Sequence, residues 1–183
     1  MNRFLSLLLL TLGLATTTGA LAEKADSEKP TKVQADQMVY DDEKQVNTFT
    51  GNVVLTRGTL TMRGHKLTVV QDGEGYQFAT LLAAPGRIAS FRQKRDAGPD
   101  QWVEGQAERI EYDDKSEVVK LFTNAQIKRL EGSTPTDEVE GQFIAYDSRA
   151  EFFTVSNTAS GKTTAGSGRV TAVIQPRSET KGK

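Results

Sequence analysis

Two stretches of the chain are close to being copies of each other. One begins at Tyr40 as "YDDEKQVNTFTGNVVL" and the other at Tyr112 as "YDDKSEVVKLFTNAQI", while a weaker copy, "AYDSRAEFFTVSN", begins at Ala145. We interpret each copy as two strands joined by an acidic turn. A single hairpin cannot bury its apolar face, so the copies must stack edge to edge to build a continuous apolar surface. The repeat therefore predicts a rolled stack of β-hairpins.

The rest of the chain supports the same fold class. Short segments rich in Val, Thr, Phe and Tyr recur about every ten positions and are separated by turn signals such as Pro85-Gly86. No stretch of the chain after residue 22 keeps a helical apolar spacing over three turns. The pattern is typical of an all-β sandwich, roll or barrel. Alternation places the following side chains on a common apolar face: Phe49, Gly51, Val53, Leu55, Leu60, Met62, Leu67, Val69, Ala89, Phe91, Ile110 and Tyr112.

Composition limits what this fold can be. With 183 residues, of which 37% are hydrophobic, the chain can build one domain with a substantial core. It contains 23 Lys and Arg against 24 Asp and Glu, a balance that lacks the basic footprint of a nucleic-acid partner. Cysteine is absent, so strand pairing and the core must stabilise the fold without disulfides.

The first residues predict a secretory leader. Arg3 supplies a positive start, an apolar run from Phe4 to Leu14 follows, and Ala20-Leu21-Ala22 forms an A-x-A cleavage box. A retained membrane anchor would need a longer apolar run and no cleavage box. We expect cleavage after residue 22 and export of the mature chain. Residues 23–30 are expected to form a flexible lead-in, residues 31–175 the folded domain, and residues 176–183 a disordered basic tail.

Catalytic and metal chemistry have little support. His65 is the only histidine and cysteine is absent, which together exclude Cys–His sites and the common His-rich zinc sites. No G-x-S-x-G motif, phosphate-binding loop or dinucleotide motif is present. The acidic doublets Asp41-Asp42 and Asp113-Asp114 lack the spacing of a calcium loop and are explained as turn residues. We expect no catalytic residue, no metal and no cofactor.

The apolar stripe by itself is best explained as an ordinary sandwich core. Stacked hairpins, however, leave two open ends, and "KVQADQMVY" and "GRVTAVI" are plausible edge strands. An open-ended β-roll can hold a long apolar ligand along its core. It can also add a strand from a second copy at each end.

Three segments resemble the OstA-like family of periplasmic proteins: "TFTGNVVLTRGTLTMRGHKLTV" (48–69), "GRIASFRQ" (86–93) and "VEGQAERIEYD" (103–113). The resemblance covers about residues 31–155. It implies an incomplete, twisted β-jellyroll of stacked antiparallel strands that is open at both ends. It further implies a periplasmic, non-enzymatic protein of outer-membrane biogenesis that holds the lipid A acyl chains of lipopolysaccharide in an apolar groove.

The resemblance also implies partners. Copies of the protein dock head to tail, and inner-membrane and outer-membrane lipopolysaccharide-transport proteins with the same β-fold dock at the ends. The resulting bridge carries lipopolysaccharide from the inner-membrane extractor to the outer-membrane translocon.

The resemblance assigns acyl-chain contacts to particular positions. Two departures stand out: Thr31 replaces a larger aliphatic residue, and "FTNA" in the second repeat replaces a T-G-N-A pattern, which predicts a differently built turn there. The implied lipid-contacting residues are Thr31, Val33, Phe91, Ile110 and Tyr112, with Phe49 and Met62 added as matching apolar core positions.

Two alternatives stay open on the sequence alone. The first is a periplasmic β-sandwich that binds carbohydrate or mediates adhesion, although Trp102 is the only tryptophan available for stacking on sugars. The second is a polysaccharide-active enzyme that uses Glu104 and Glu108 as its carboxylate pair.

Overall fold

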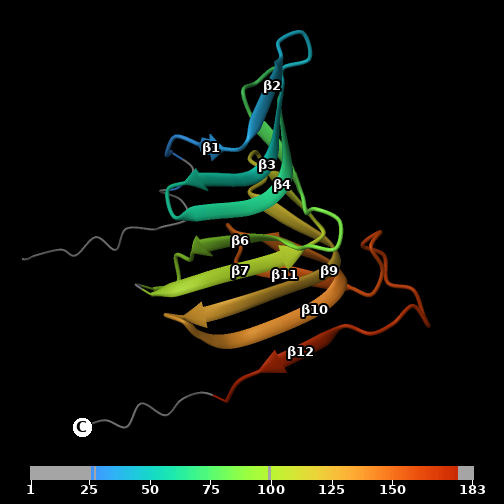
Figure 1. The fold of residues 1–183 in the computed structure, drawn as a ribbon. Coiled ribbons are helices and arrows are strands. Elements are labelled where there is room, and N and C mark those ends of the chain that lie inside the picture. The colour runs from blue at the N-terminus through green and yellow to red at the C-terminus, as the bar shows by residue number, and fades with distance from the viewer. Residues whose placement is uncertain (1–25, 27, 99, 177–183) are drawn as a thin grey trace, which may run out of the picture.

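The computed structural model describes residue 26, residues 28–98 and residues 100–176. The predicted leader (1–22) and most of the predicted tail (176–183) lie outside these residues. Within the described chain, twelve antiparallel strands form one sheet that folds over on itself (Figure 1). No helix of this part is long and apolar enough to cross a membrane. The strands are β1 (Lys32–Gln34), β2 (Gln37–Asp41), β3 (Val46–Arg57), β4 (Leu60–Gln71), β5 (Gln77–Leu82), β6 (Ala89–Lys94), β7 (Gln101–Ala107), β8 (Arg109–Asp113), β9 (Val118–Glu131), β10 (Thr134–Asp147), β11 (Phe152–Ser156) and β12 (Thr171–Ile174).

Four long strands, β3, β4, β9 and β10, each pair with two different neighbours along their two halves. Strand β3, for example, pairs with β2 over Val46–Thr50 and with β1 over Val54–Thr56. The long strands therefore run through two faces. We call the face containing β2, β5, β8 and β11 sheet I, and the face containing β1, β6, β7 and β12 sheet II. The strands stack from β1 and β2 at one end to β12 at the other (Figure 1), so the predicted all-β roll of antiparallel strands is confirmed.

The bends of β3 and β9 are built alike. Gly51 and Asn52 have φ values of 81° and 45°, and Thr123 and Asn124 have φ values of 64° and 53°. In β3 this pair forms a bulge, because two residues stand opposite one residue of β4. The expectation of a differently built turn in the second repeat is wrong. Thr123 adopts the left-handed conformation even though that region disfavours a β-branched residue.

The same hydrogen bonds hold both bends. The main-chain N–H of Asp36 donates to the carbonyl of Gly51 over 3.0 Å, and that of Glu108 donates to the carbonyl of Thr123 over 3.1 Å. The Asn52 amide donates to the Asp36 carboxylate over 2.9 Å. The Asn124 amide donates to the Glu108 carboxylate over 2.7 Å. The sequence repeat is therefore a repeat of structure as well.

The three predicted acidic turns also share one geometry. Each begins with an aspartate that accepts a hydrogen bond from a main-chain N–H two or three residues later. Each ends with a non-glycine residue of positive φ, close to 50°. These aspartates satisfy local donors, as expected for turn residues. The opening aspartates are Asp41, Asp113 and Asp147, and the closing residues are Gln45, Glu117 and Glu151.

The inward faces of the two sheets form the core. Phe91 is 2% exposed and Ile110 is fully buried, and the remaining members of the predicted apolar face lie in or against the same cluster apart from Gly51, which lies at the bend. The outer edges of the stack match the predicted edge strands. Exposed apolar side chains stand there: Met38, Val39 and Tyr40 on β2, and Val173 and Ile174 on β12.

Candidate functional site

The apolar interior between the sheets is the candidate site, and it gathers the side chains predicted to contact lipid. Met62 and Phe91 project inward from β4 and β6 of sheet II, while Ile110 projects inward from β8 of sheet I, and all three are buried. Three further predicted residues, Val33, Phe49 and Tyr112, are partly buried and contact this cluster. Thr31 lies just before β1 and is exposed to solvent.

The interior is nearly full in this structure. Thr31, Met62 and Tyr112 meet around an apolar cavity of about 20 Å³. That volume holds about one water molecule and no acyl chain. A long apolar ligand can enter only if the two sheets separate and the ligand replaces contacts between side chains. The lining is completed by Leu55, Arg57, Leu60, Val69, Gln77 and Ala79.

Phe91 owes its position to a glycine on the neighbouring strand. Phe91 pairs across β6 and β7 with Gly105. A Cβ atom built on Gly105 would lie 2.1 Å from the ring atom Cε1 of Phe91, well inside van der Waals contact. The ring therefore lies directly against the backbone of β7, where only glycine leaves room for it.

On the side away from the bends, the hairpin ends of the two sheets face each other along a line that we call the seam. Two ion pairs cross it. Arg57 Nη1 lies 2.6 Å from Asp114 Oδ1, and Arg95 Nη2 lies 2.5 Å from Glu151 Oε2. In both pairs the arginine belongs to sheet II and the carboxylate to a turn of sheet I. Charged side chains therefore join the two sheets across the seam.

A third acidic side chain lies at the same seam. Asp26 is buried, and its carboxylate accepts hydrogen bonds from the main-chain N–H of Thr59 over 2.7 Å, the Thr59 hydroxyl over 2.5 Å and the Gln93 amide over 3.2 Å. Its carbonyl accepts a bond from Arg57 Nε over 3.1 Å. Residue 26 thus anchors the chain ahead of β1 to the β3–β4 turn, within the segment expected to be a lead-in.

Comparison with known proteins agrees with this architecture. Residues 32–152 match the family described as "LptA/(LptD N-terminal domain) LPS transport protein". This chain belongs to that family. The family membership expected from the three quoted segments is therefore confirmed.

Family members resemble this chain over most of its length. The lipopolysaccharide export system protein LptA of Haemophilus influenzae is 31% identical over 97% of this chain and 95% of its own. LptA of Escherichia coli K12 is 32% identical over 74% of this chain and 71% of its own. The crystal structure of LptH from Pseudomonas aeruginosa, described as the LptA-homologous periplasmic component of the lipopolysaccharide transport device, superposes with a TM-score of 0.71 at 28% identity. The match covers 83% of this chain and 99% of LptH.

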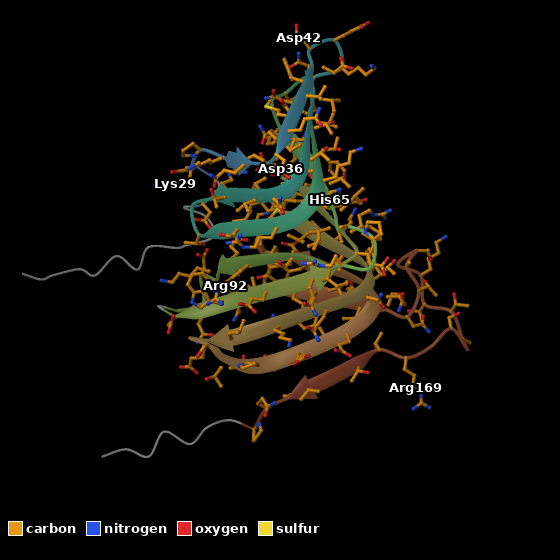
Figure 2. The ribbon with its side chains drawn as sticks, viewed as in Figure 1. Lys29, Asp36, Asp42, His65, Arg92 and Arg169 are labelled. Carbon is orange, nitrogen blue, oxygen red and sulfur yellow. The ribbon has the colours of Figure 1, made fainter. Side chains whose placement is uncertain are left out.

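Side chains considered for other chemistry have structural partners or lie apart. Glu104 pairs with Arg92 on the outer face of sheet II, and Glu108 accepts the Asn124 amide at the bend. His65 is exposed on β4 (Figure 2). Among the described residues, no group of three or more His, Cys, Asp or Glu side chains is placed to hold a metal ion. Glu104 and Glu108 line different surface pockets, so the structure does not bring them into one site.

The sole tryptophan is engaged as well. The guanidinium of Arg92 lies 4.4 Å from the centroid of the Trp102 ring, and the indole N–H donates to Asp100. Arg92 projects from the outer side of the molecule (Figure 2). The ring face covered by Arg92 is therefore unavailable to a sugar, and no further observation favours a carbohydrate-binding module.

Burial perturbs one titratable group of the interior. Burial raises the pKa of Tyr112 to about 12, and the nearby Asp114 carboxylate adds to the shift because a second negative charge would repel the phenolate. Tyr112 is therefore neutral at physiological pH and acts as an amphipathic wall of the cavity.

Sequence reasoning missed the charged residues of the seam. Strand alternation does put Arg57 on the same face as Leu55, so a basic residue at the end of an inward-facing run was a usable signal. Its carboxylate partner was not identifiable, because Asp114 belongs to another hairpin.

Proposed function

We propose that this chain is a periplasmic lipopolysaccharide-binding transport protein. The acyl chains of lipid A lie between sheets I and II, and the protein carries lipopolysaccharide from the inner-membrane extractor toward the outer-membrane translocon. The family description, the names of the LptA relatives and the periplasmic description of LptH support this assignment.

One observation carries the proposal: a continuous apolar interior runs along the stack, from β3 to β10, and the ion pairs Arg57–Asp114 and Arg95–Glu151 cross its seam. Removing each CH₂ group of an acyl chain from water contributes roughly 0.8 kcal/mol. An acyl chain that separates the sheets replaces one set of apolar contacts with another. Opening the seam then requires mainly that the ion pairs across it break and that their charged groups take other partners.

The lipid contacts follow from this arrangement. Met62, Phe91 and Ile110 contact the acyl chains along the middle of the interior, and Tyr112 contacts them near the seam. Val33, Phe49 and Thr31 contact chains toward the β1–β2 end. In this role the protein needs no catalytic group, because it moves lipid without changing a covalent bond.

The exposed ends of the stack suit the expected partners. Strands β1 and β2 at one end, and β11 and β12 at the other, each pair with one strand only. Such edges can add a strand from another chain. We therefore propose head-to-tail association with further copies and with inner- and outer-membrane partners of the same fold.

Site-specific photocrosslinking in the periplasm tests the proposal. A photoreactive residue at Tyr112, which faces the interior, is compared with one at Glu111, the adjacent residue on the opposite face of β8. We expect a lipopolysaccharide adduct at position 112 and none at position 111. Equal adducts, or none at 112 in a folded and exported protein, would contradict an interior lipid site.

The same preparation tests export. Mass spectrometry of the periplasmic protein should give a chain that begins at Glu23, as cleavage after Ala22 predicts. A mass that includes residues 1–22 would contradict the predicted leader.

A further inference from the structure

Three inward-facing runs of sheet II change from apolar to basic as they approach the seam. In β3, buried Leu55 is followed on the same face by Arg57. In β9, buried Ile127 is followed by Arg129, which stands opposite the buried Val103. The third run follows β6, where Phe91 and Gln93 lead to Arg95. We call Arg57, Arg95 and Arg129 the arginine row.

The arginine row is regular along the stack. Strands β3, β6 and β9 are every second strand of sheet II, since β4 lies between the first two and β7 between the last two. Neighbouring strands are separated by about 4.8 Å, so successive arginines stand about 10 Å apart along the seam. Arg57 and Arg129 also occupy the same position in the two copies of the sequence repeat. The repeat thus places a guanidinium at the seam twice.

Two arginines of the row share one partner residue. Arg95 and Arg129 both converge on Glu151: Arg95 contacts its carboxylate, while Arg129 Nη2 donates to its carbonyl over 2.7 Å. The Arg129 guanidinium lies 5.0 Å from the ring of Phe153, on sheet I. Glu151 therefore contacts both arginines, one through its carboxylate and the other through its main-chain carbonyl.

Arg95 is a buried charged side chain with an unused hydrogen-bond donor, as is common for ligand-binding residues. Only 8% of the residue is exposed, and its Nε–H is buried and has no hydrogen-bond partner among the described residues. A buried donor without an acceptor is unfavourable and uncommon. Arg95 therefore has an unused donor beside its ion pair with Glu151.

We propose that the arginine row binds the phosphate groups of a lipid headgroup. When no lipid is bound, Asp114 pairs with Arg57 and Glu151 pairs with Arg95. This inference rests on the proposed function, because acyl chains held between the sheets bring the headgroup out at the seam. Guanidinium groups bind phosphate and carboxylate through the same paired N–H donors, so a phosphate can replace each carboxylate without rebuilding the site. Exchange of partners would open the seam as lipid enters.

Matched amphiphiles test the arginine row. Lysophosphatidic acid and a monoacylglycerol of the same acyl chain differ only in the phosphate, and their affinities can be measured by displacement of a fluorescent fatty acid. We expect the folded protein to prefer the phosphorylated lipid by about tenfold or more, the scale of one hydrogen bond to a charged group. Equal affinities for the two lipids would overturn the inference but leave the proposed function intact. Failure to bind either lipid would contradict both.

Variants locate the preference. In the double variant Arg95→Gln, Arg129→Gln, the ratio of the affinity for lysophosphatidic acid to the affinity for the monoacylglycerol should fall close to one. The affinity for the monoacylglycerol itself should stay within about twofold of the parent value. Glu151→Gln removes the competing carboxylate and should raise the preference severalfold. Arg92→Gln is the matched control, because Arg92 lies on the outer face of β6, the strand that leads to Arg95. A preference unchanged by both Glu151→Gln and the double variant, or lost equally in Arg92→Gln, would refute the assignment.

Competition with inorganic phosphate distinguishes a lipid headgroup from free phosphate as the anion that the arginine row binds. If the row binds a lipid headgroup, low-millimolar phosphate should leave the preference largely intact, because the acyl chain holds the headgroup next to the row at high effective concentration. If phosphate abolishes the preference, the site is one for free phosphate and the headgroup assignment is wrong.

Discussion

Arg57 and Asp114 meet across the seam, with 2.6 Å between Nη1 and Oδ1, although 57 positions separate them in the chain. The two side chains are only 13% and 17% exposed. Together with Arg95 and Glu151, they join the hairpin ends of sheet II to those of sheet I. The bends on the opposite side are part of continuous strands. The seam is therefore the side on which the sheets can separate.

The first prediction concerns this ion pair. Because both groups are partly buried, replacing one leaves the other without its partner, and Asp114→Ala should lower the free energy of unfolding by about 1–3 kcal/mol. In a double-mutant cycle with Arg57→Met, the two losses should be less than additive. Urea denaturation measures both quantities. The exposed pair Lys44–Asp41 is the control, and Lys44→Ala should change stability by less than about 1 kcal/mol. Additive losses in the cycle would show that the pair is not coupled.

The second prediction concerns the glycine beneath Phe91. Gly105→Ala places a methyl group within 2.1 Å of the Phe91 ring and must displace it, which should cost about 1–3 kcal/mol of stability. Gly73→Ala is the control, since a Cβ there meets nothing within 4 Å. Thermal unfolding compares the two variants. If Gly105→Ala were as stable as Gly73→Ala, the close contact between ring and backbone would be disproved.

The third prediction concerns the bend of β9. Thr123 holds a φ of 64°, which is unfavourable for a β-branched residue, so Thr123→Gly should relieve strain and stabilise the fold by about 1 kcal/mol. The reverse change at the equivalent position, Gly51→Thr, should destabilise it, because a Cβ at Gly51 would lie 2.2 Å from Asp36 Oδ2. In chemical denaturation, the unfolding midpoint should therefore rise for Thr123→Gly and fall for Gly51→Thr. A loss of stability in Thr123→Gly would argue against strain at this bend.

The fourth prediction concerns alkaline pH. The pKa of Tyr112 is about 12 in the folded protein because of burial, against about 10 in an unfolded chain. Below pH 10 the phenol is neutral in both states and its contribution to stability is fully present. Between pH 10 and 12 the unfolded state loses its proton first, so stability falls by up to about 2–3 kcal/mol as pH rises.

Comparison of the parent protein with Tyr112→Phe isolates this contribution. The variant has no phenol at position 112, so its free energy of unfolding should decline less steeply between pH 10 and 12. Denaturation curves collected at several pH values provide the slopes. Parallel slopes in the two proteins would mean that Tyr112 titrates normally.

Much of this protein follows from local sequence. Alternation correctly placed Met62, Phe91 and Ile110 on the buried face, because side chains of a strand point to opposite sides with a period of two. The acidic turns were equally predictable, since an aspartate in a tight turn bonds to main-chain donors only a few residues away. The prediction of a different turn at Thr123 was wrong because the bend is imposed by the long strand crossing two sheets. That tertiary constraint overrides the conformational preference of the residue.

Local sequence thus predicts which residues face inward and where each hairpin turns, because both depend on neighbours within a few positions. What those faces contact depends on how the long strands bend and pack. The contacts of Arg57 with Asp114, of Arg95 with Glu151 and of Asp26 with the β3–β4 turn join segments that are distant along the chain. Such pairs form only when four bent strands fold one sheet over the other, and no local pattern specifies which charges then come together at the seam.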